Sequence, residues 1–270
     1  MGRKKIYLDY NLIAYYFDRS NNEFCEKFDL VKDFCDFPYS PAHLEEIAVP
    51  IMKQHKLEKP LEAVIQLGSD KLNNISLMTR NIELLPREGR STILTHEMPI
   101  DCLKRVIKYY HLNEAAEKNE EDFLTKCKDG DPSGEISNTV SNLPENFLRN
   151  TDFGRNLENK LELDLMCAIE ARKARITEFR WPFIGRTHQL LERTLELTFN
   201  FLEEIRFKPE SISKSRSRIH DVSHAIYATS ADYFVSNDPK LIAKTKVVYN
   251  YFNIKTKAIS LKEFIDIKHF

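Results

Sequence analysis

Acidic residues that follow short apolar segments give this chain its clearest chemical signature. Asp9 follows the apolar segment 6–8 near the N-terminus, and Asp238 lies shortly after the apolar segment 233–235 near the C-terminus. Asp221 lies 17 residues before Asp238, a spacing that suits a helix, a turn and a strand. Acids at the carboxyl ends of parallel strands meet at one edge of a sheet, where their oxygens can hold a divalent cation. The spacing therefore predicts a metal-dependent enzyme.

A further acidic block lies in a predicted helix between these two ends. Ser40 and Pro41 suit the N-cap and first position of a helix over 41–55, which carries Glu45 and Glu46. Hydrolysis of a phosphodiester needs an activated water and a positive charge beside the phosphate. Mg²⁺ or Mn²⁺ bound by carboxylates supplies both. The block therefore adds a candidate carboxylate to the acids at the strand ends.

These residues resemble the PIN-domain nucleases, a family of metal-dependent ribonucleases that includes many bacterial toxins. The resemblance lies in four places, which are Leu8-Asp9-Tyr10-Asn11, Ser40-Pro41-Ala42-His43-Leu44-Glu45-Glu46-Ile47, Asp221 and Ser236-Asn237-Asp238. In the second of these, the acid six residues after a small polar residue is Glu46. The resemblance implies that Asp9, Glu46, Asp221 and Asp238 form one catalytic and metal-binding cluster.

The resemblance also implies an activity and a substrate. It implies a Mg²⁺- or Mn²⁺-dependent endonuclease, with an endoribonuclease acting as a toxin or phage-defence effector as the preferred role. Single-stranded RNA or tRNA is the expected substrate, and DNA is the second candidate. An inhibitory or activating protein partner is expected, and an oligomer stays open. One alternative is a non-enzymatic PIN-like scaffold that binds a protein partner.

A second alternative is an HD-type metal phosphohydrolase. It depends on His220-Asp221 together with His224, which lies one helical turn after His220, and on a further histidine such as His188. Imidazole groups on one helix face suit a transition-metal site. This alternative predicts an all-helical fold, and it leaves Asp9 and the segment 233–238 unexplained.

Polar residues near the acids are candidates for holding the carboxylates or the substrate. Asn11, Ser236 and Asn237 are candidate hydrogen-bond partners of the carboxylates. His224 is either a contact for a substrate phosphate or a packed structural histidine. The basic segment before Asp221 supplies three candidate phosphate contacts, which are Lys214, Arg216 and Arg218. The competing interpretation of that segment is a solvated loop.

Hydrophobic periodicity predicts the elements that position these residues. Strands are predicted at 5–9, 36–39, 233–236, 247–249 and 257–259. Helices are predicted at 11–17, 22–35 and 41–55. A further helix is predicted with Asp221 near its start, and the last one from Leu261 onward with Ser260 as N-cap. Residues 60–218 are predicted to be mostly helical, with amphipathic stretches at 100–127 and 157–206 and a polar loop at 128–146.

Alternating strands and helices at both ends predict one α/β unit that is interrupted by a long helical insertion. The predicted fold is a three-layer α/β/α sandwich with a short central parallel sheet, as in PIN domains. Its catalytic core comprises residues 1–58 and 219–270, and residues 59–218 form the insertion, packed on or beside the core. For this fold the two ends of the chain must meet in one sheet.

Composition limits the class of protein. The 270 residues are 42% hydrophobic and 30% charged, which is typical of a soluble globular protein. The net charge of −1 means that any contact with nucleic acid must come from local basic patches. The five scattered cysteines include no Cys-x-x-Cys pair, which favours reduced thiols. No segment approaches the length of a membrane span, so a cytoplasmic protein without a membrane partner is expected.

Overall fold

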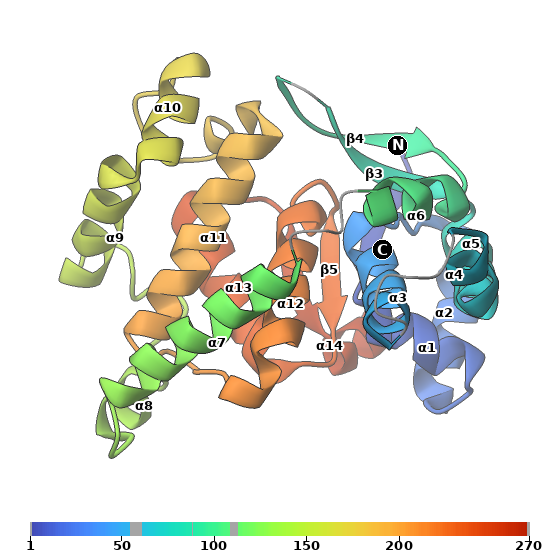
Figure 1. The fold of residues 1–270 in the computed structure, drawn as a ribbon, viewed down its shortest axis with the longest axis horizontal. Coiled ribbons are helices and arrows are strands. Elements are labelled where there is room, and N and C mark those ends of the chain that lie inside the picture. Colours follow the sequence, from blue (N-terminus) through green and yellow to red (C-terminus); the bar gives the residue numbers. More distant parts are fainter. Residues whose placement is uncertain (1, 55–60, 88, 109–112, 269–270) are drawn as a thin grey trace.

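The computed structural model describes residues 2–54, 61–87, 89–108 and 113–268 (Figure 1). The elements up to residue 129 are β1 (Lys4–Leu8), α1 (Tyr10–Phe17), α2 (Asn22–Val31), β2 (Cys35–Asp36), α3 (Pro41–Gln54), α4 (Leu61–Leu67), α5 (Ser69–Thr79), β3 (Ile82–Arg87), β4 (Arg90–His96), α6 (Pro99–Lys108) and α7 (Asn113–Asp129). The later elements, in which η marks a 3-10 helix, are α8 (Glu135–Val140), α9 (Asp152–Leu163), α10 (Leu165–Lys173), η2 (Ile184–Arg186), α11 (His188–Glu204), η3 (Ile212–Lys214), α12 (Ser215–Ala228), β5 (Tyr233–Ser236), α13 (Pro239–Phe252), β6 (Lys257–Ser260) and α14 (Leu261–Asp266).

A four-stranded parallel sheet joins the two ends of the chain. Its strand order is β2-β1-β5-β6, and each neighbouring pair is parallel. β1 pairs with β5 so that Leu8 lies opposite Val235. The carboxyl ends of β1 and β5 therefore lie side by side, which confirms the prediction that both ends of the chain form one α/β sheet.

Two buried hydrophobic clusters lie on the two faces of this sheet. Along β1, Tyr7 belongs to one cluster, whereas Ile6 and Leu8 belong to the other, because successive side chains of a strand point to opposite faces. Phe234 and Val235 of β5 divide in the same way. The first cluster includes side chains of α9–α13, and the second includes side chains of α1–α6 and α14. This arrangement agrees with a three-layer α/β/α sandwich.

The segment 59–218, predicted as an insertion, contributes to both clusters. Its helices α4, α5 and α6 pack on the side of α1–α3, and its helices α9, α10 and α11 pack on the side of α12 and α13. The predicted boundary at residue 58 and the predicted end of a helix at residue 55 lie outside the described residues. The division into core and insertion stays a prediction.

An antiparallel hairpin interrupts the region that was predicted to be mostly helical. β3 and β4 form it, with Leu84 opposite Leu94 and with Gly89 at a φ of +64° in the connection. Tyr39 extends the pairing through a parallel bridge to Glu83. The helical prediction is wrong here, because a short apolar run suits a strand or a buried helix until its partner is known.

Residues 247–249, predicted as a strand, lie in α13 instead. Asp238 caps this helix by accepting hydrogen bonds from the N–H groups of Lys240 and Leu241, and proline occupies the first turn. Val247 and Val248 are fully buried. Their β-branched side chains therefore serve core packing rather than strand pairing, and tertiary burial overrides the local strand preference.

Other predicted elements change in length rather than in type. The stretch 157–206 is divided into shorter helices, and the described parts of 100–127 lie in α6 and α7. The predicted loop 128–146 contains α8. Asp221 lies in the middle of α12 rather than near its start. The last helix begins as predicted, with Ser260 and Glu263 forming a capping box. Within the described ranges, no helix has both the length and the apolar character needed to cross a bilayer.

Candidate metal centre

Asp9 lies at the carboxyl end of β1, where the sheet fixes its backbone. Its N–H donates to the carbonyl oxygen of Val235 at 2.9 Å. The residue is 2% exposed, and its Oδ2 accepts a hydrogen bond from Ser236 Oγ at 2.7 Å. Its Oδ1 is buried and has no hydrogen-bond partner among the described residues. The sheet therefore holds a buried carboxylate with one oxygen unused.

Two further side chains converge on that oxygen. Glu46 comes from α3 and His224 comes from α12. His224 Nε2 lies 4.0 Å from Asp9 Oδ1 and 3.6 Å from Glu46 Oε1. Ligand atoms from the three residues all lie within 4.8 Å of one another. His224 Nε2, like Asp9 Oδ1, is buried without a hydrogen-bond partner in the described part of the chain.

The spacing of these atoms fits a divalent metal ion. Two ligand atoms about 2.1 Å from one ion lie roughly 3 Å apart at a right angle and about 4 Å apart on opposite sides. The two separations of 3.6 and 4.0 Å fall in this range. Buried polar atoms normally have partners, so a cation between these facing atoms would satisfy both. We call Asp9, Glu46 and His224 the candidate metal centre.

The other two predicted acids lie around the candidate metal centre. Asp221 precedes His224 by almost one turn of α12, and the charge of Asp9 acts on it. Asp238 uses Oδ1 to cap α13, and its Oδ2 lies 3.6 Å from Lys214 Nζ. The structure thus brings Asp9 and Glu46 into direct reach of one ion and leaves Asp221 and Asp238 beside it.

Burial and mutual repulsion disfavour the ionised carboxylates at this site. Burial raises the pKa of Asp9, although the neighbouring His224 acts in the opposite direction. Burial also raises the pKa of Asp221 well above its ordinary value, with the charge of Asp9 as the next cause. For His224, burial lowers the pKa, but the Glu46, Asp9 and Asp221 carboxylates outweigh burial and raise it. A divalent cation would offset the surplus negative charge.

Three buried residues behind His224 are not among the predicted site residues. Tyr7 Oη lies 2.7 Å from His224 Nδ1 and 2.6 Å from Ser40 Oγ. The N–H of Ser40 donates to His43 Nδ1 at 3.1 Å. A signal for this network exists in the sequence, because Tyr7 places a hydroxyl group in the middle of an apolar strand that ends in an acid.

The predicted hydrogen-bond partners of the acids occupy different positions. Ser236 donates to Asp9, as described above. Asn237 instead donates from Nδ2 to Tyr15 Oη at 3.2 Å. Asn11 is exposed on α1. Of these three predicted residues, Ser236 is the one that the structure places in contact with a carboxylate of the candidate metal centre.

Two of the predicted phosphate contacts lie near the surface beside acids. Lys214, at the end of η3, lies beside Asp238, and its side chain is 54% exposed. Arg216 Nε lies 3.5 Å from Glu117 Oε1 on α7. The exposed ammonium group of Lys214 therefore adds a positive charge at the edge of the acidic group.

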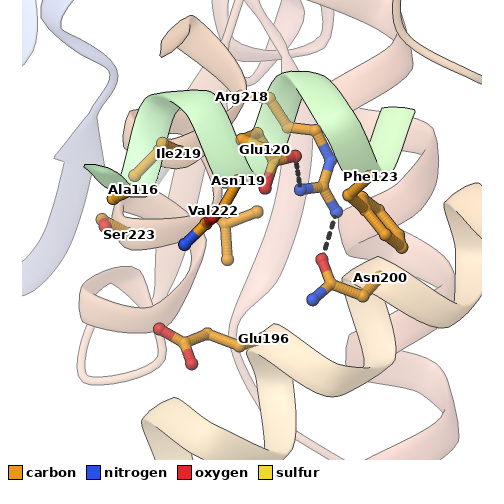
Figure 2. A pocket seen from close by; sticks show the side chains of 10 residues that line it. All are labelled: Ala116, Asn119, Glu120, Phe123, Glu196, Asn200, Arg218, Ile219, Val222 and Ser223. Carbon is orange, nitrogen blue, oxygen red and sulfur yellow. Dashed lines mark hydrogen bonds and ion pairs between the residues drawn. The ribbon is translucent and has the colours of Figure 1, made fainter. Parts of the chain in front are cut away.

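Arg218 is buried in the fold instead of facing a substrate. It ion-pairs with Glu120 and Glu203 and donates from Nη2 to Asn200 Oδ1 at 2.7 Å. Arg218, Glu120 and Asn200 line a cavity of about 410 Å³ between α7, α11 and α12. Figure 2 shows these three side chains. The structure thus corrects the prediction of a phosphate contact for Arg218, because its side chain is 5% exposed and pairs with acids of α7 and α11.

The geometry does not favour the HD-type alternative. His220 Nδ1 lies 3.6 Å from Glu45 Oε2, whereas His188 Nδ1 lies 2.8 Å from Thr92 Oγ1 on the hairpin. His188 is therefore engaged elsewhere. That alternative also expects an all-helical chain, which the parallel sheet contradicts.

Glu192 on α11 makes the stability of the fold pH-dependent. Burial, aided by the carboxylates of Glu196 and Glu45, raises its pKa from 4.5 to about 7. The folded chain therefore takes up a proton at Glu192, and this contribution to stability is lost as the pH rises from about 4.5 to about 7. After allowance for the partial exposure of Glu192, we expect the natural chain to lose on the order of 2 kcal/mol of unfolding free energy over this pH range. Glu192→Gln has a neutral side chain at every pH, so it should not show this loss.

Urea unfolding below and above this pH range, at pH 5 and at pH 8, measures the effect. The difference in unfolding free energy between the two pH values should be smaller in Glu192→Gln than in the natural chain. Glu204→Gln is a matched control, because Glu204 is an exposed carboxylate on the same helix. Equal pH dependence in Glu192→Gln and the natural chain would contradict the prediction.

Comparison of the chain with protein-family models, curated proteins and solved structures gave no match.

Proposed function

We propose that this chain hydrolyses phosphodiester bonds with a divalent metal ion held by Asp9, Glu46 and His224, and that RNA is its substrate. One observation carries the proposal. Asp9 Oδ1 and His224 Nε2 are buried, face each other beside the Glu46 carboxylate, and have no hydrogen-bond partner among the residues that the structure describes. RNA as the substrate, and a role as a toxin or phage-defence effector, rest on the resemblance to PIN-domain nucleases alone.

The residues around the candidate metal centre suit this reaction. A metal ion bound there would supply an activated water and positive charge beside the phosphate. Ser236 holds Asp9 Oδ2, so that Oδ1 stays directed at the centre. Asp221 lies close enough to Asp9 and Glu46 for their charges to act on it, and in its ionised form its carboxylate can accept the proton that the attacking water loses. Lys214 provides an exposed positive charge for a flanking phosphate.

Metal removal tests the proposal directly. The protein is incubated with end-labelled single-stranded RNA, tRNA and single-stranded DNA, with Mn²⁺ or with EDTA. We expect cleavage of RNA with Mn²⁺ and none with EDTA. Asp221→Asn, purified in parallel, should cleave at least about a hundredfold more slowly. Asp152→Asn is the control, because its exposed carboxylate lies on α9 and takes no part in the centre.

Two outcomes would contradict the proposal. Cleavage that persists in EDTA, or that is unchanged in Asp221→Asn, would assign the activity to another site or to a contaminant. Absence of cleavage on all three substrates, with no metal bound, would favour the non-enzymatic scaffold that binds a protein partner.

A further inference from the structure

The ring of His224 has two nitrogen atoms in very different surroundings. Nε2 faces Asp9 and Glu46, as described above. Nδ1 lies 2.7 Å from Tyr7 Oη, and both residues are fully buried. A neutral imidazole carries its proton on one nitrogen and a lone pair on the other. The direction of the hydrogen bond to Tyr7 therefore decides whether Nε2 can bind a metal ion.

The neighbouring His43 limits what the tyrosine proton can do. Because the N–H of Ser40 donates to His43 Nδ1, this nitrogen is an acceptor. The opposite nitrogen, Nε2, then carries the proton and donates to the carbonyl oxygen of Leu8 at 2.9 Å. Ser40 already uses His43 Nδ1, which lies 3.3 Å from Tyr7 Oη. The two shorter contacts of Tyr7 Oη are to Ser40 and to His224.

One arrangement of protons satisfies these contacts and leaves Nε2 free. Tyr7 donates its proton to Ser40 Oγ at 2.6 Å, and His224 donates from Nδ1 to Tyr7 Oη at 2.7 Å. The lone pair of His224 Nε2 then faces Asp9 Oδ1 and Glu46 Oε1. Histidines that bind metals commonly donate their other N–H to an oxygen that fixes the ring in this way.

We propose that Tyr7 is a positioning residue that holds His224 with its proton on Nδ1, so that Nε2 completes a mixed nitrogen and oxygen site. Such a site prefers a first-row transition ion such as Mn²⁺ over Mg²⁺. This inference rests on the metal site of the proposed function. It goes beyond that site by assigning a role to Tyr7 and a preference among metal ions.

The preference follows from the chemistry of the ligands. Mg²⁺ is a hard ion that takes oxygen ligands and keeps several waters. Imidazole nitrogen binds transition ions more strongly, and buried carboxylates serve both classes of ion. We expect the natural chain to bind Mn²⁺ at least roughly tenfold more tightly than Mg²⁺, and His224→Gln to lose most of that ratio.

Electron spin-echo spectroscopy of bound Mn²⁺ tests the ligand, because it detects ¹⁴N that is coordinated to the ion. The natural chain should show this ¹⁴N signal, and His224→Gln should lack it. Tyr7→Phe keeps the shape of the ring but removes the hydroxyl group. We expect it to weaken Mn²⁺ binding by about 10- to 100-fold in calorimetric titration.

Tyr249→Phe is the matched control, because it also removes a fully buried tyrosine hydroxyl, one that donates to the carbonyl oxygen of Ala225. It should bind Mn²⁺ like the natural chain and show the same ¹⁴N signal. Circular dichroism and urea unfolding of each variant establish that it is folded before its metal affinity is compared.

The results separate this inference from the proposed function. Bound Mn²⁺ without a ¹⁴N signal in the natural chain, or unchanged affinity in Tyr7→Phe, would overturn the inference even if RNA is cleaved. A ¹⁴N signal that depends on His224, in a protein that cleaves no phosphodiester, would support the inference and remove the nuclease function. If no Mn²⁺ binds, the inference fails, and the cleavage assay with EDTA tests the function independently.

Discussion

Asp9→Asn is expected to reduce metal-dependent cleavage by about a thousandfold or more while the chain stays folded. The substitution removes the charge that holds the ion but keeps the shape of the side chain. Its amide oxygen can still accept the hydrogen bond that Ser236 Oγ donates. Because burial raises the pKa of Asp9, a neutral side chain also suits the site in the metal-free protein. The variant should therefore be at least as stable as the natural chain without metal.

Cleavage rates and thermal unfolding with and without Mn²⁺ measure both parts of this expectation. Mn²⁺ should raise the melting temperature of the natural chain and leave that of Asp9→Asn unchanged, because only a bound ligand stabilises the folded state. Asp232→Asn is the control. Asp232 accepts a hydrogen bond from the N–H of Lys5 at the opposite end of the same sheet. Normal cleavage by Asp9→Asn would remove the candidate metal centre from the mechanism.

Glu203→Ala is expected to destabilise the fold by about 3–5 kcal/mol, since it removes a buried carboxylate that two buried cations share. Arg218 then keeps its pair with Glu120, and Lys244 keeps its pair with Glu210. Glu203 is fully buried and ion-pairs with both Arg218 and Lys244. Arg218 is 5% exposed and Lys244 is 3% exposed, so water cannot replace the missing carboxylate. The Oε2 atom of Glu203 also accepts a hydrogen bond from the N–H of Glu210 at 3.1 Å.

Urea unfolding measures the loss of stability. Glu204→Ala, one residue further along α11, is the control, because its exposed side chain pairs with an exposed lysine. That substitution should change the free energy of unfolding by no more than about 0.5 kcal/mol. A similar change in both variants would show that the ion pairs of Glu203 do not stabilise the fold. Arg218→Ala should also destabilise, in keeping with a structural rather than a substrate-binding role.

The strand-and-acid units could be predicted because they leave a local pattern. An apolar segment followed by an acid, as at Asp9, depends on neighbouring residues, and Ser260 with Glu263 forms a cap that two positions define. The hairpin of β3 and β4 and the helical state of 247–249 depend on which other elements cover them. Local sequence does not contain that information, so both predictions failed.

The residues of the candidate metal centre also differ in whether the local sequence predicts them. The acids Asp9 and Glu46 could be selected because carboxylates at predicted sheet edges are chemically conspicuous. The contribution of His224 depends on the distance between α12 and α3, which no spacing in the chain specifies. Arg218 could not be recognised as structural, because one of its acidic partners lies 98 residues away in the sequence.

Because β1 pairs with β5, the candidate metal centre cannot form until both strands have been synthesised. Asp9 and Ser236, which share a hydrogen bond, are 227 residues apart. At a synthesis rate of about 5–20 residues per second, roughly 10–45 s pass between the emergence of the first and the second. During this time β1 lacks β5, its neighbour in the centre of the sheet. A nascent chain therefore carries two of the three ligands, Asp9 and Glu46, near the ribosome and its RNA well before the third ligand, His224, emerges.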